Sequence, residues 1–170
     1  MERQQMQTEL SRLADVCRNE SVPDAFQTFL EGIPNLTKTE RRIFDGYVAG
    51  LRSREIVEQL SLEGKRSVVL TGAAAGEDAT GAVCFDAADG RVHAVQTQRV
   101  PREFHGTGDV FASVLTGALV QGASLTEAAR AAVDFVKLCA ERTAAEGLPM
   151  REGVDFEPLL GALTAWGART

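Results

Sequence analysis

The chain has 170 residues and a formal net charge of −6, with 44% hydrophobic and 25% charged residues. This composition predicts a folded protein of one domain, or of one domain with an appendage, and the acidic balance argues against a surface built to bind nucleic acid. Three widely spaced cysteines and two histidines give no pattern for structural zinc or a disulfide framework, and no stretch approaches the roughly 18 apolar residues of a membrane span, so we expect a cytoplasmic protein with reduced thiols.

Helices are predicted first along the chain. Apolar residues recur at steps of three and four through residues 1–20, and a short helix is expected over 24–31. Thr37 and Glu40 have the spacing of a capping box, in which a hydroxyl and a carboxylate satisfy the free amides at a helix start. The helix that follows should end at Gly50, because glycine suits a left-handed helix stop.

A second helix is expected over 54–60, capped by Ser53. Two short helices joined at a glycine turn are typical of a helix-turn-helix. The positions that carry a closer pattern are Leu36, Thr37, Glu40, Arg41, Ile43, Phe44, Tyr47, Gly50, Arg54, Glu55, Ile56 and Leu60. On these residues, segment 36–62 resembles the start of the DNA-binding domain of LuxR-type regulators. The recognition helix that this family places in the major groove does not follow, and a helical hairpin kept for packing is the other interpretation.

Strand patterns come next. The run Ser67–Leu70 is β-branched and apolar and leads into Thr71 and Gly72, where an open α/β sheet usually presents a ligand loop. Two further strands, over 81–85 and 91–97, flank the turn signal Asp89-Gly90 and predict a hairpin.

Gly106-Thr107-Gly108-Asp109 is the motif with chemical content. Glycines before a helix let backbone N–H groups turn toward an anion, and the helix dipole adds positive charge there. A carboxylate beside a phosphate is better suited to act as a base on a second substrate than to bind the phosphate. The motif thus indicates phosphoryl transfer, although Asp109 could instead only cap the helix.

Three helices are predicted after this motif. The first runs from about 107 to Gly122, the second opens at the capping box Ser124–Glu127 and reaches about Arg142, and the last covers Phe156–Leu163. The second is rich in alanine, which suits tight packing against a helix or an adenine ring.

A longer pattern joins these elements. Its residues are Val68 to Gly72, Phe104 to Ser113, Gly117 to Leu119, Gly122, Ser124, Leu125, Glu127, Ala128, Ala132 to Phe135 and Gly153 to Phe156. On these residues, segment 67–163 resembles the C-terminal part of pyridoxal kinase, within the ribokinase-like superfamily. The resemblance implies an α/β fold, the C-terminal half of a three-layer sandwich, preceded here by an all-helical segment.

The resemblance also implies roles for particular positions. Asp109 would be the catalytic base toward the hydroxymethyl group of a B6 vitamer. The anion hole would consist of Gly106, Thr107 and Gly108. The nucleotide would lie against Thr71, Gly72, Val133 and Val136. ATP with Mg²⁺ would be the phosphoryl donor, and no protein metal ligand is identified.

The expected domains are a helical arm over 1–35, a truncated helix-turn-helix over 36–64 and a ribokinase-like domain over 65–170. The family's N-terminal substrate half and its upstream acidic motif are not seen in this sequence. We therefore expect a small-molecule kinase of doubtful activity, with a DNA-binding regulator fragment or an inactive remnant as alternatives. A parallel sheet cut in half would expose an edge and an apolar face, so we expect a homo-oligomer.

Overall fold

The computed structural model describes residues 36–73, 78–147, 149 and 152–167. The helices predicted over 1–20 and 24–31 lie outside the described residues. The chain forms two compact units, residues 1–50 and 51–170, and each is considered by itself. No described helix combines the length and the apolar character that crossing a membrane requires.

In the first unit the structure describes helix α3, Lys38–Val48. The capping box is confirmed: the Thr37 amide donates to the Glu40 carboxylate over 2.8 Å, and the Glu40 amide donates to the Thr37 hydroxyl over 3.3 Å. The chain leaves the helix through Gly50, whose φ of 79° confirms the left-handed stop expected there.

The second unit contains an antiparallel sheet with the order β1-β2-β3. Its strands are β1 (Val68–Thr71), β2 (Ala79–Asp86) and β3 (Arg91–Gln98). The predicted hairpin is confirmed, with Gly90 in the left-handed region at φ 68°. Our expectation of a parallel sheet is wrong for the described strands, because strands joined by short connections can only pair antiparallel.

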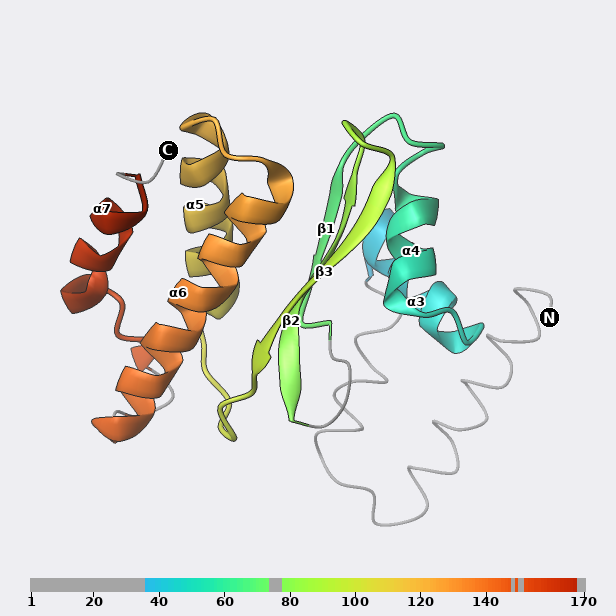
Figure 1. The fold of residues 1–170 in the computed structure, drawn as a ribbon. Coiled ribbons are helices and arrows are strands. Elements are labelled where there is room, and N and C mark those ends of the chain that lie inside the picture. Colours follow the sequence, from blue (N-terminus) through green and yellow to red (C-terminus); the bar gives the residue numbers. More distant parts are fainter. Residues whose placement is uncertain (1–35, 74–77, 148, 150–151, 168–170) are drawn as a thin grey trace, which may run out of the picture. The chain divides into compact units, whose positions relative to one another are not determined.

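Helix α4, Ser53–Leu60, lies on one face of this sheet (Figure 1). Its N-cap is Arg52 and not the predicted Ser53. The Glu55 carboxylate accepts a 2.7 Å hydrogen bond from the Arg52 amide, so the reciprocal carboxylate contact sets the helix start one residue earlier.

The inward face of α4 is apolar, as its sequence predicts. Ile56, Val57 and Leu60 are buried, and Val57 joins a cluster with Val83 and Phe85 of β2. Alternate residues of a strand point to opposite faces, so these β2 residues cover the side of the sheet next to α4. Helix α4 therefore belongs to the same unit as the sheet, although we expect a domain boundary between them, near residue 64.

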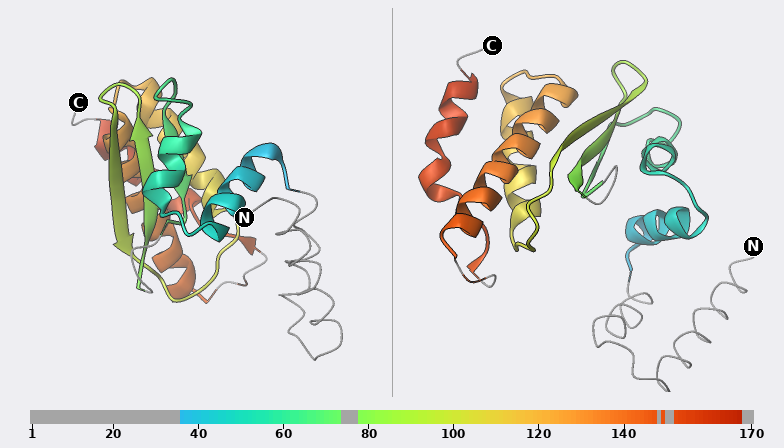
Figure 2. Two further views of the ribbon diagram at one scale, coloured as in Figure 1. Left: turned by 90° about the vertical axis from the view of Figure 1, so that its right-hand side faces the viewer. Right: turned by 60° about the horizontal axis from the view of Figure 1, so that its bottom comes forward.

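The opposite face of the sheet is covered by α6 (Leu125–Ala145), and α5 (Thr107–Val120) packs beside α6 and reaches the same core through Phe111. Figure 2 shows the sheet between α4 and this helix pair, so the second unit has three layers. A second hydrophobic cluster fills the space between the sheet and these helices. It is made of strand residues that point away from α4 and of helical residues that meet them, namely Ala82, Cys84, Val95, Phe111, Leu125, Ala129, Ala132 and Val133. Small residues on α6 let the helix lie close to the sheet.

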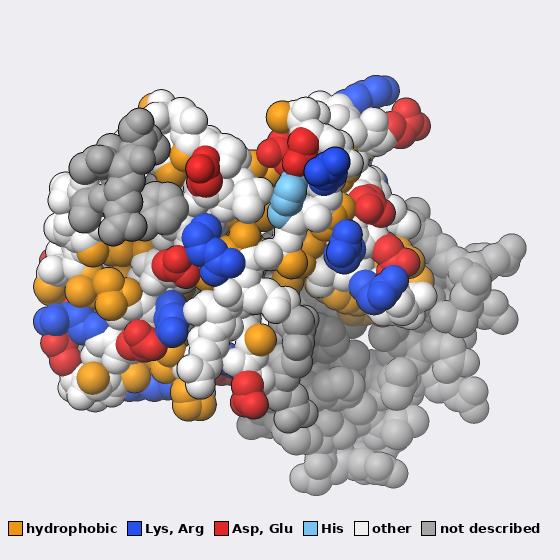
Figure 3. All heavy atoms as spheres, viewed as in Figure 1, with side chains coloured by type: hydrophobic (Ala, Val, Ile, Leu, Met, Phe, Trp, Pro, Cys, Tyr) orange, Lys and Arg blue, Asp and Glu red, His pale blue; other side chains and the backbone are white. Residues whose placement is uncertain are grey.

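The C-terminal segment differs from its prediction. A 3-10 turn, η3 (Glu157–Leu159), precedes α7 (Gly161–Gly167), so the single helix expected over 156–163 is divided. Pro158 stands at the start of η3, where its missing N–H is tolerated. In the space-filling view acidic and basic side chains are interspersed, and hydrophobic side chains reach the surface over the C-terminal helices (Figure 3).

Candidate functional site

The start of α5 exposes a row of backbone amides. Gly106 is the N-cap and adopts φ 79° and ψ −5°, and the first helical hydrogen bond runs from the Val110 amide to the Gly106 carbonyl over 3.1 Å. Within the described residues, the amides of Thr107, Gly108 and Asp109 have no protein acceptor. The left-handed glycine turns the chain just before these free donors, which lie at the positive end of the helix dipole, so their geometry is suited to binding an anion.

The Asp109 side chain makes no cap hydrogen bond to the start of α5, so the capping role considered for it is not found. Asp109 is the third residue of α5, and no side chain makes the cap hydrogen bond at Gly106. Its side chain is exposed, and its backbone carbonyl accepts a 2.8 Å hydrogen bond from the Ser113 hydroxyl. The carboxylate is thus available to a ligand at the first turn of the helix.

A cavity of about 300 Å³ lies between the sheet and the two helices, and we call it the sheet-side cavity. The predicted site residues that line it are Thr71, Gly72, Thr107, Gly108, Val133 and Val136. They come from the end of β1, the first turn of α5 and the middle of α6, which are far apart in sequence. The fold therefore brings the predicted nucleotide residues and two anion-hole residues around one space.

The same cavity has basic residues that the sequence did not identify. Arg99, Arg102 and Lys137 all line it. The Arg102 guanidinium lies 5.7 Å from the centre of the Phe104 ring, and the Lys137 amine lies 3.5 Å from the Glu141 carboxylate. Lys137 was within reach of sequence reasoning, because it is one helical turn after Val133 and shares its face.

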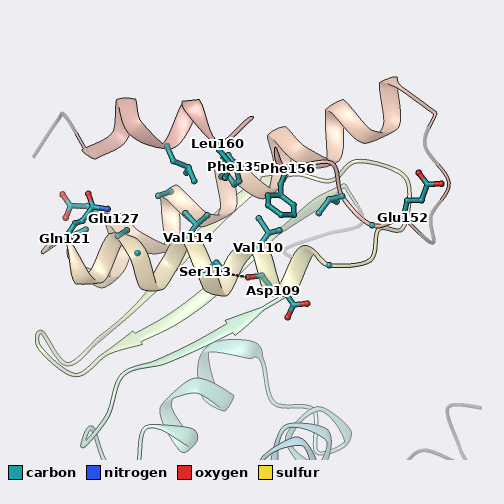
Figure 4. A pocket seen from close by; sticks show the side chains of 18 residues that line it. Asp109, Val110, Ser113, Val114, Gln121, Glu127, Phe135, Glu152, Phe156 and Leu160 are labelled. Atoms are coloured by element: carbon teal, nitrogen blue, oxygen red, sulfur yellow. Dashed lines mark hydrogen bonds between the residues drawn. The ribbon is translucent and has the colours of Figure 1, made fainter. Parts of the chain in front are cut away.

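The other two predicted residues, Gly106 and Asp109, line a larger cavity of about 690 Å³. This helical cavity lies between α5, α6 and the C-terminal segment, and most of its walls are apolar. In Figure 4 the side chains of Val110, Phe156 and Leu160 point into it, whereas the carboxylate of Asp109 points outward. The first turn of α5 thus separates the two cavities, with the carboxylate at its exposed edge.

The described residues contain no group of three potential metal ligands among histidine, cysteine and carboxylate side chains. A Mg²⁺ ion that kept most of its water and was held by nucleotide phosphates would fit this donor set, since Mg²⁺ commonly binds in that way. The two described cysteines are unsuited to nucleophilic chemistry. Burial raises the pKa of the Cys84 and Cys139 thiols to about 11, assisted by the nearby carboxylates of Asp86 and Asp155 respectively.

Comparison with known proteins relates this chain to small-molecule kinases. The sequence profile described as phosphomethylpyrimidine kinase matches residues 33–153. Because the match covers well over half of the sequence, the chain belongs to the phosphomethylpyrimidine kinase family. No match was found among curated proteins.

Solved structures agree with this assignment. One is a protein assigned as a phosphomethylpyrimidine kinase from Bacteroides thetaiotaomicron, with 31% identity, a TM-score of 0.61, and coverage of 65% of this chain and 38% of that one. A second crystal form of it, with pyridoxal, gives 30% identity, a TM-score of 0.60, and coverage of 65% and 40%. Pyridoxal kinase from Lactobacillus plantarum gives 27% identity, a TM-score of 0.59, and coverage of 67% of this chain and 41% of that one. The chain spans about two fifths of the length of these proteins.

These comparisons support the resemblance to kinases. They give no support to the resemblance to LuxR-type regulators. The family match includes the whole segment 36–62 that suggested a helix-turn-helix. The apolar face of α4, which we interpreted as part of a DNA-binding scaffold, is buried against a sheet in the same unit. Amphipathic helices of similar length occur in both classes, so the local pattern could not distinguish them.

Proposed function

We propose that this chain provides the nucleotide side of an ATP-dependent kinase that phosphorylates the hydroxymethyl group of a B6 vitamer or a related heterocyclic alcohol. The observation that carries the proposal is the exposed first turn of α5. There Gly106 turns the backbone, and the amides of residues 107–109 stand free beside a cavity with basic walls. The class of acceptor comes from the relatives, one of which is a pyridoxal kinase and another of which was crystallised with pyridoxal.

In this proposal the triphosphate enters the sheet-side cavity. Val133 and Val136 supply apolar surface for the base, and Thr71 and Gly72 flank the nucleotide. Arg99, Arg102 and Lys137 face the phosphate oxygens and offset their charge. Mg²⁺ would arrive with the nucleotide and would offset the negative charge of its phosphates.

The transfer itself uses the end of α5. Asp109 accepts the proton of the acceptor hydroxyl, the alcohol oxygen bonds to the γ-phosphorus, and the bond from that phosphorus to the β–γ bridging oxygen breaks. ADP leaves with that oxygen. The amides of Thr107 and Gly108 donate to the γ-phosphoryl oxygens while the charge is redistributed, which is where fixed donors lower a barrier most.

The test is a coupled assay of ADP release by the purified chain with ATP and Mg²⁺, with and without an acceptor. Pyridoxal and a hydroxymethylpyrimidine are the two alcohol acceptors to compare. Release that depends on an acceptor, and that is lost in Asp109→Asn, supports the kinase. Saturable ATP binding without any acceptor-dependent release indicates a nucleotide-binding remnant, and absence of ATP binding at millimolar concentration contradicts both.

A further inference from the structure

We propose that Thr143 and Asp155 are positioning residues that hold the phosphate-binding loop, residues 105–109, in its binding conformation through a chain of hydrogen bonds from α6. This inference rests on the proposed function, because it assigns a role in anion binding to residues that do not touch the anion. The first observation is that segment 153–155 runs beside this loop.

The first link joins this segment to the loop. The Val154 amide donates a 3.1 Å hydrogen bond to the carbonyl of His105, the residue just before the N-cap. A methyl group added at Gly106 would lie 4.0 Å from Cγ2 of Val154, so the Val154 side chain reaches the turn itself. The orientation of the His105–Gly106 peptide therefore depends on where Val154 lies.

The second link is hydrophobic. Val154 is 6% exposed and packs in one cluster with Phe135 and Cys139 of α6. Phe104, just before the loop, and Val110, just after its glycines, pack against the same cluster. Both sides of the loop are thus held against the buried cluster that contains Val154, which limits the ways in which the loop amides can turn.

The third link anchors the segment to the C-terminal part of α6. The Thr143 hydroxyl accepts a 2.9 Å hydrogen bond from the Asp155 amide and donates a 2.7 Å hydrogen bond to the Cys139 carbonyl. Thr143 is 1% exposed, so the Asp155 amide would lose its partner in a buried setting if the hydroxyl were removed.

An ion pair reinforces this anchor. The Arg142 Nε donates to Oδ2 of Asp155 over 2.9 Å, and this hydrogen bond to the Asp155 carboxylate raises the pKa of Arg142, with a further contribution from the charge of Glu146. Arg142 also contacts the Glu146 carboxylate. Two successive residues of α6 therefore hold the backbone and the side chain of Asp155.

The chain offers a matched control for Thr143. Ser61, on the other face of the sheet, is a second buried hydroxyl near a helix C-terminus that links the helix to the segment after it. It is 2% exposed, donates to the Glu58 carbonyl over 2.6 Å and accepts from the Gly64 amide over 3.0 Å. Loss of either hydroxyl removes the same kind of contact, but only Thr143 is connected to the phosphate-binding loop.

The experiment compares Thr143→Val, Thr143→Ser and Ser61→Ala with the parent chain in two measurements. The first is amide hydrogen exchange of Val110 and Val154, whose amides donate to the carbonyls of Gly106 and His105. The second is the Kd for ATP–Mg²⁺ by calorimetry. We expect Thr143→Val to speed exchange in these residues and to weaken ATP binding about tenfold, the equivalent of one lost hydrogen bond. We expect Thr143→Ser to restore both values and Ser61→Ala to change neither.

The outcomes separate this inference from the proposed function. Unchanged loop exchange in Thr143→Val overturns the inference, as does faster exchange with an unchanged Kd. An equal effect of Ser61→Ala also overturns it, since general destabilisation would then suffice. If the parent chain binds no ATP, the proposed function fails, and exchange alone decides whether the loop is held as described. If Thr143→Val does not fold, Asp155→Asn serves as the second variant, with the same two measurements and the same deciding results.

Discussion

Gly81 of β2 lies so close to the backbone of β3 that a methyl group built on it would be 2.0 Å from the carbonyl oxygen of Val95. Val95 itself is 1% exposed and belongs to the core between the sheet and α6. The close approach of the two strands therefore depends on the absence of a side chain at position 81, beside the sheet-side cavity that Gly81 also lines.

We expect Gly81→Ala to destabilise the second unit by about 3 kcal/mol or more, because rigid backbone would have to move to relieve the overlap. Urea unfolding followed by circular dichroism measures this loss. Gly117→Ala is the control, since a methyl group there meets nothing within 4 Å and replaces glycine inside a helix. It should leave stability unchanged or raise it by up to about 1 kcal/mol. Equal stabilities of the two variants would contradict the close approach.

Val57→Ala tests whether α4 belongs to the core of the kinase-like unit. Val57 is 0% exposed and packs with Val83 and Phe85. Removing two buried methyl groups should cost about 2 kcal/mol of unfolding free energy, whereas Glu58→Ala on the exposed side should change it by less than about 0.5 kcal/mol. A single unfolding transition that shifts only for Val57→Ala is the expected result. A neutral Val57→Ala would indicate that α4 does not pack on the sheet in solution.

Asp109→Ala separates ATP binding from proton transfer. We expect the Kd for ATP–Mg²⁺ to stay within about threefold of the parent value or to fall, since the variant removes a negative charge near the triphosphate. Any acceptor-dependent turnover should disappear. Calorimetry and the coupled assay measure the two quantities on the same preparation. Loss of ATP binding in this variant would mean that Asp109 holds the nucleotide or its metal ion.

Lys137→Ala tests the basic wall of the sheet-side cavity. The Lys137 side chain is 31% exposed, so its contribution is partly screened by water. We expect about fivefold weaker ATP binding at low ionic strength, equivalent to about 1 kcal/mol, and a smaller difference at 0.5 M salt. Lys65→Ala is the control, because Lys65 is an exposed lysine that is not among the residues lining this cavity. Equal affinity of the Lys137 variant and the parent chain at every salt concentration would remove Lys137 from the site.

The buried thiols predict how stability changes at alkaline pH. Burial raises the pKa of Cys84 and Cys139 from 9.0 to about 11, so between these values the unfolded chain has released protons that the folded chain still holds. The thiols' contribution to the free energy of unfolding is therefore fully present below pH 9 and is lost as the pH rises toward 11. The loss is at most roughly 2–3 kcal/mol for each thiol.

The measurement is urea unfolding at pH 8.5 and pH 10.5, with Cys84→Ala/Cys139→Ala as the comparison. The double variant should lose less stability over this interval than the parent chain, even though its cavities make it less stable at pH 8.5. Identical losses in the two proteins would show that other groups account for the alkaline destabilisation.

The sequence by itself determined the local features whose causes lie within a few residues. The capping boxes at Thr37 and Ser124, the hairpin turn at Gly90 and the helix that starts after Gly106 were all predicted and are present. Each depends on backbone geometry or on a side chain that reaches its own helix end, so no distant residue is needed to specify it.

Only the tertiary structure decided what these elements pack against. The apolar stripe of α4 fits a DNA-binding scaffold and a sheet-covering helix equally well, and its burial on β2 selects the second. Likewise, Thr107 and Gly108 line the sheet-side cavity whereas Asp109 lines the helical cavity, and Lys137 of α6 joins Arg99 and Arg102 at the first of these. Which cavity each residue lines depends on how α5, α6 and the sheet pack together. Periodicity shows which face of a helix is apolar, but the partner of that face is chosen by long-range packing, which local patterns do not encode.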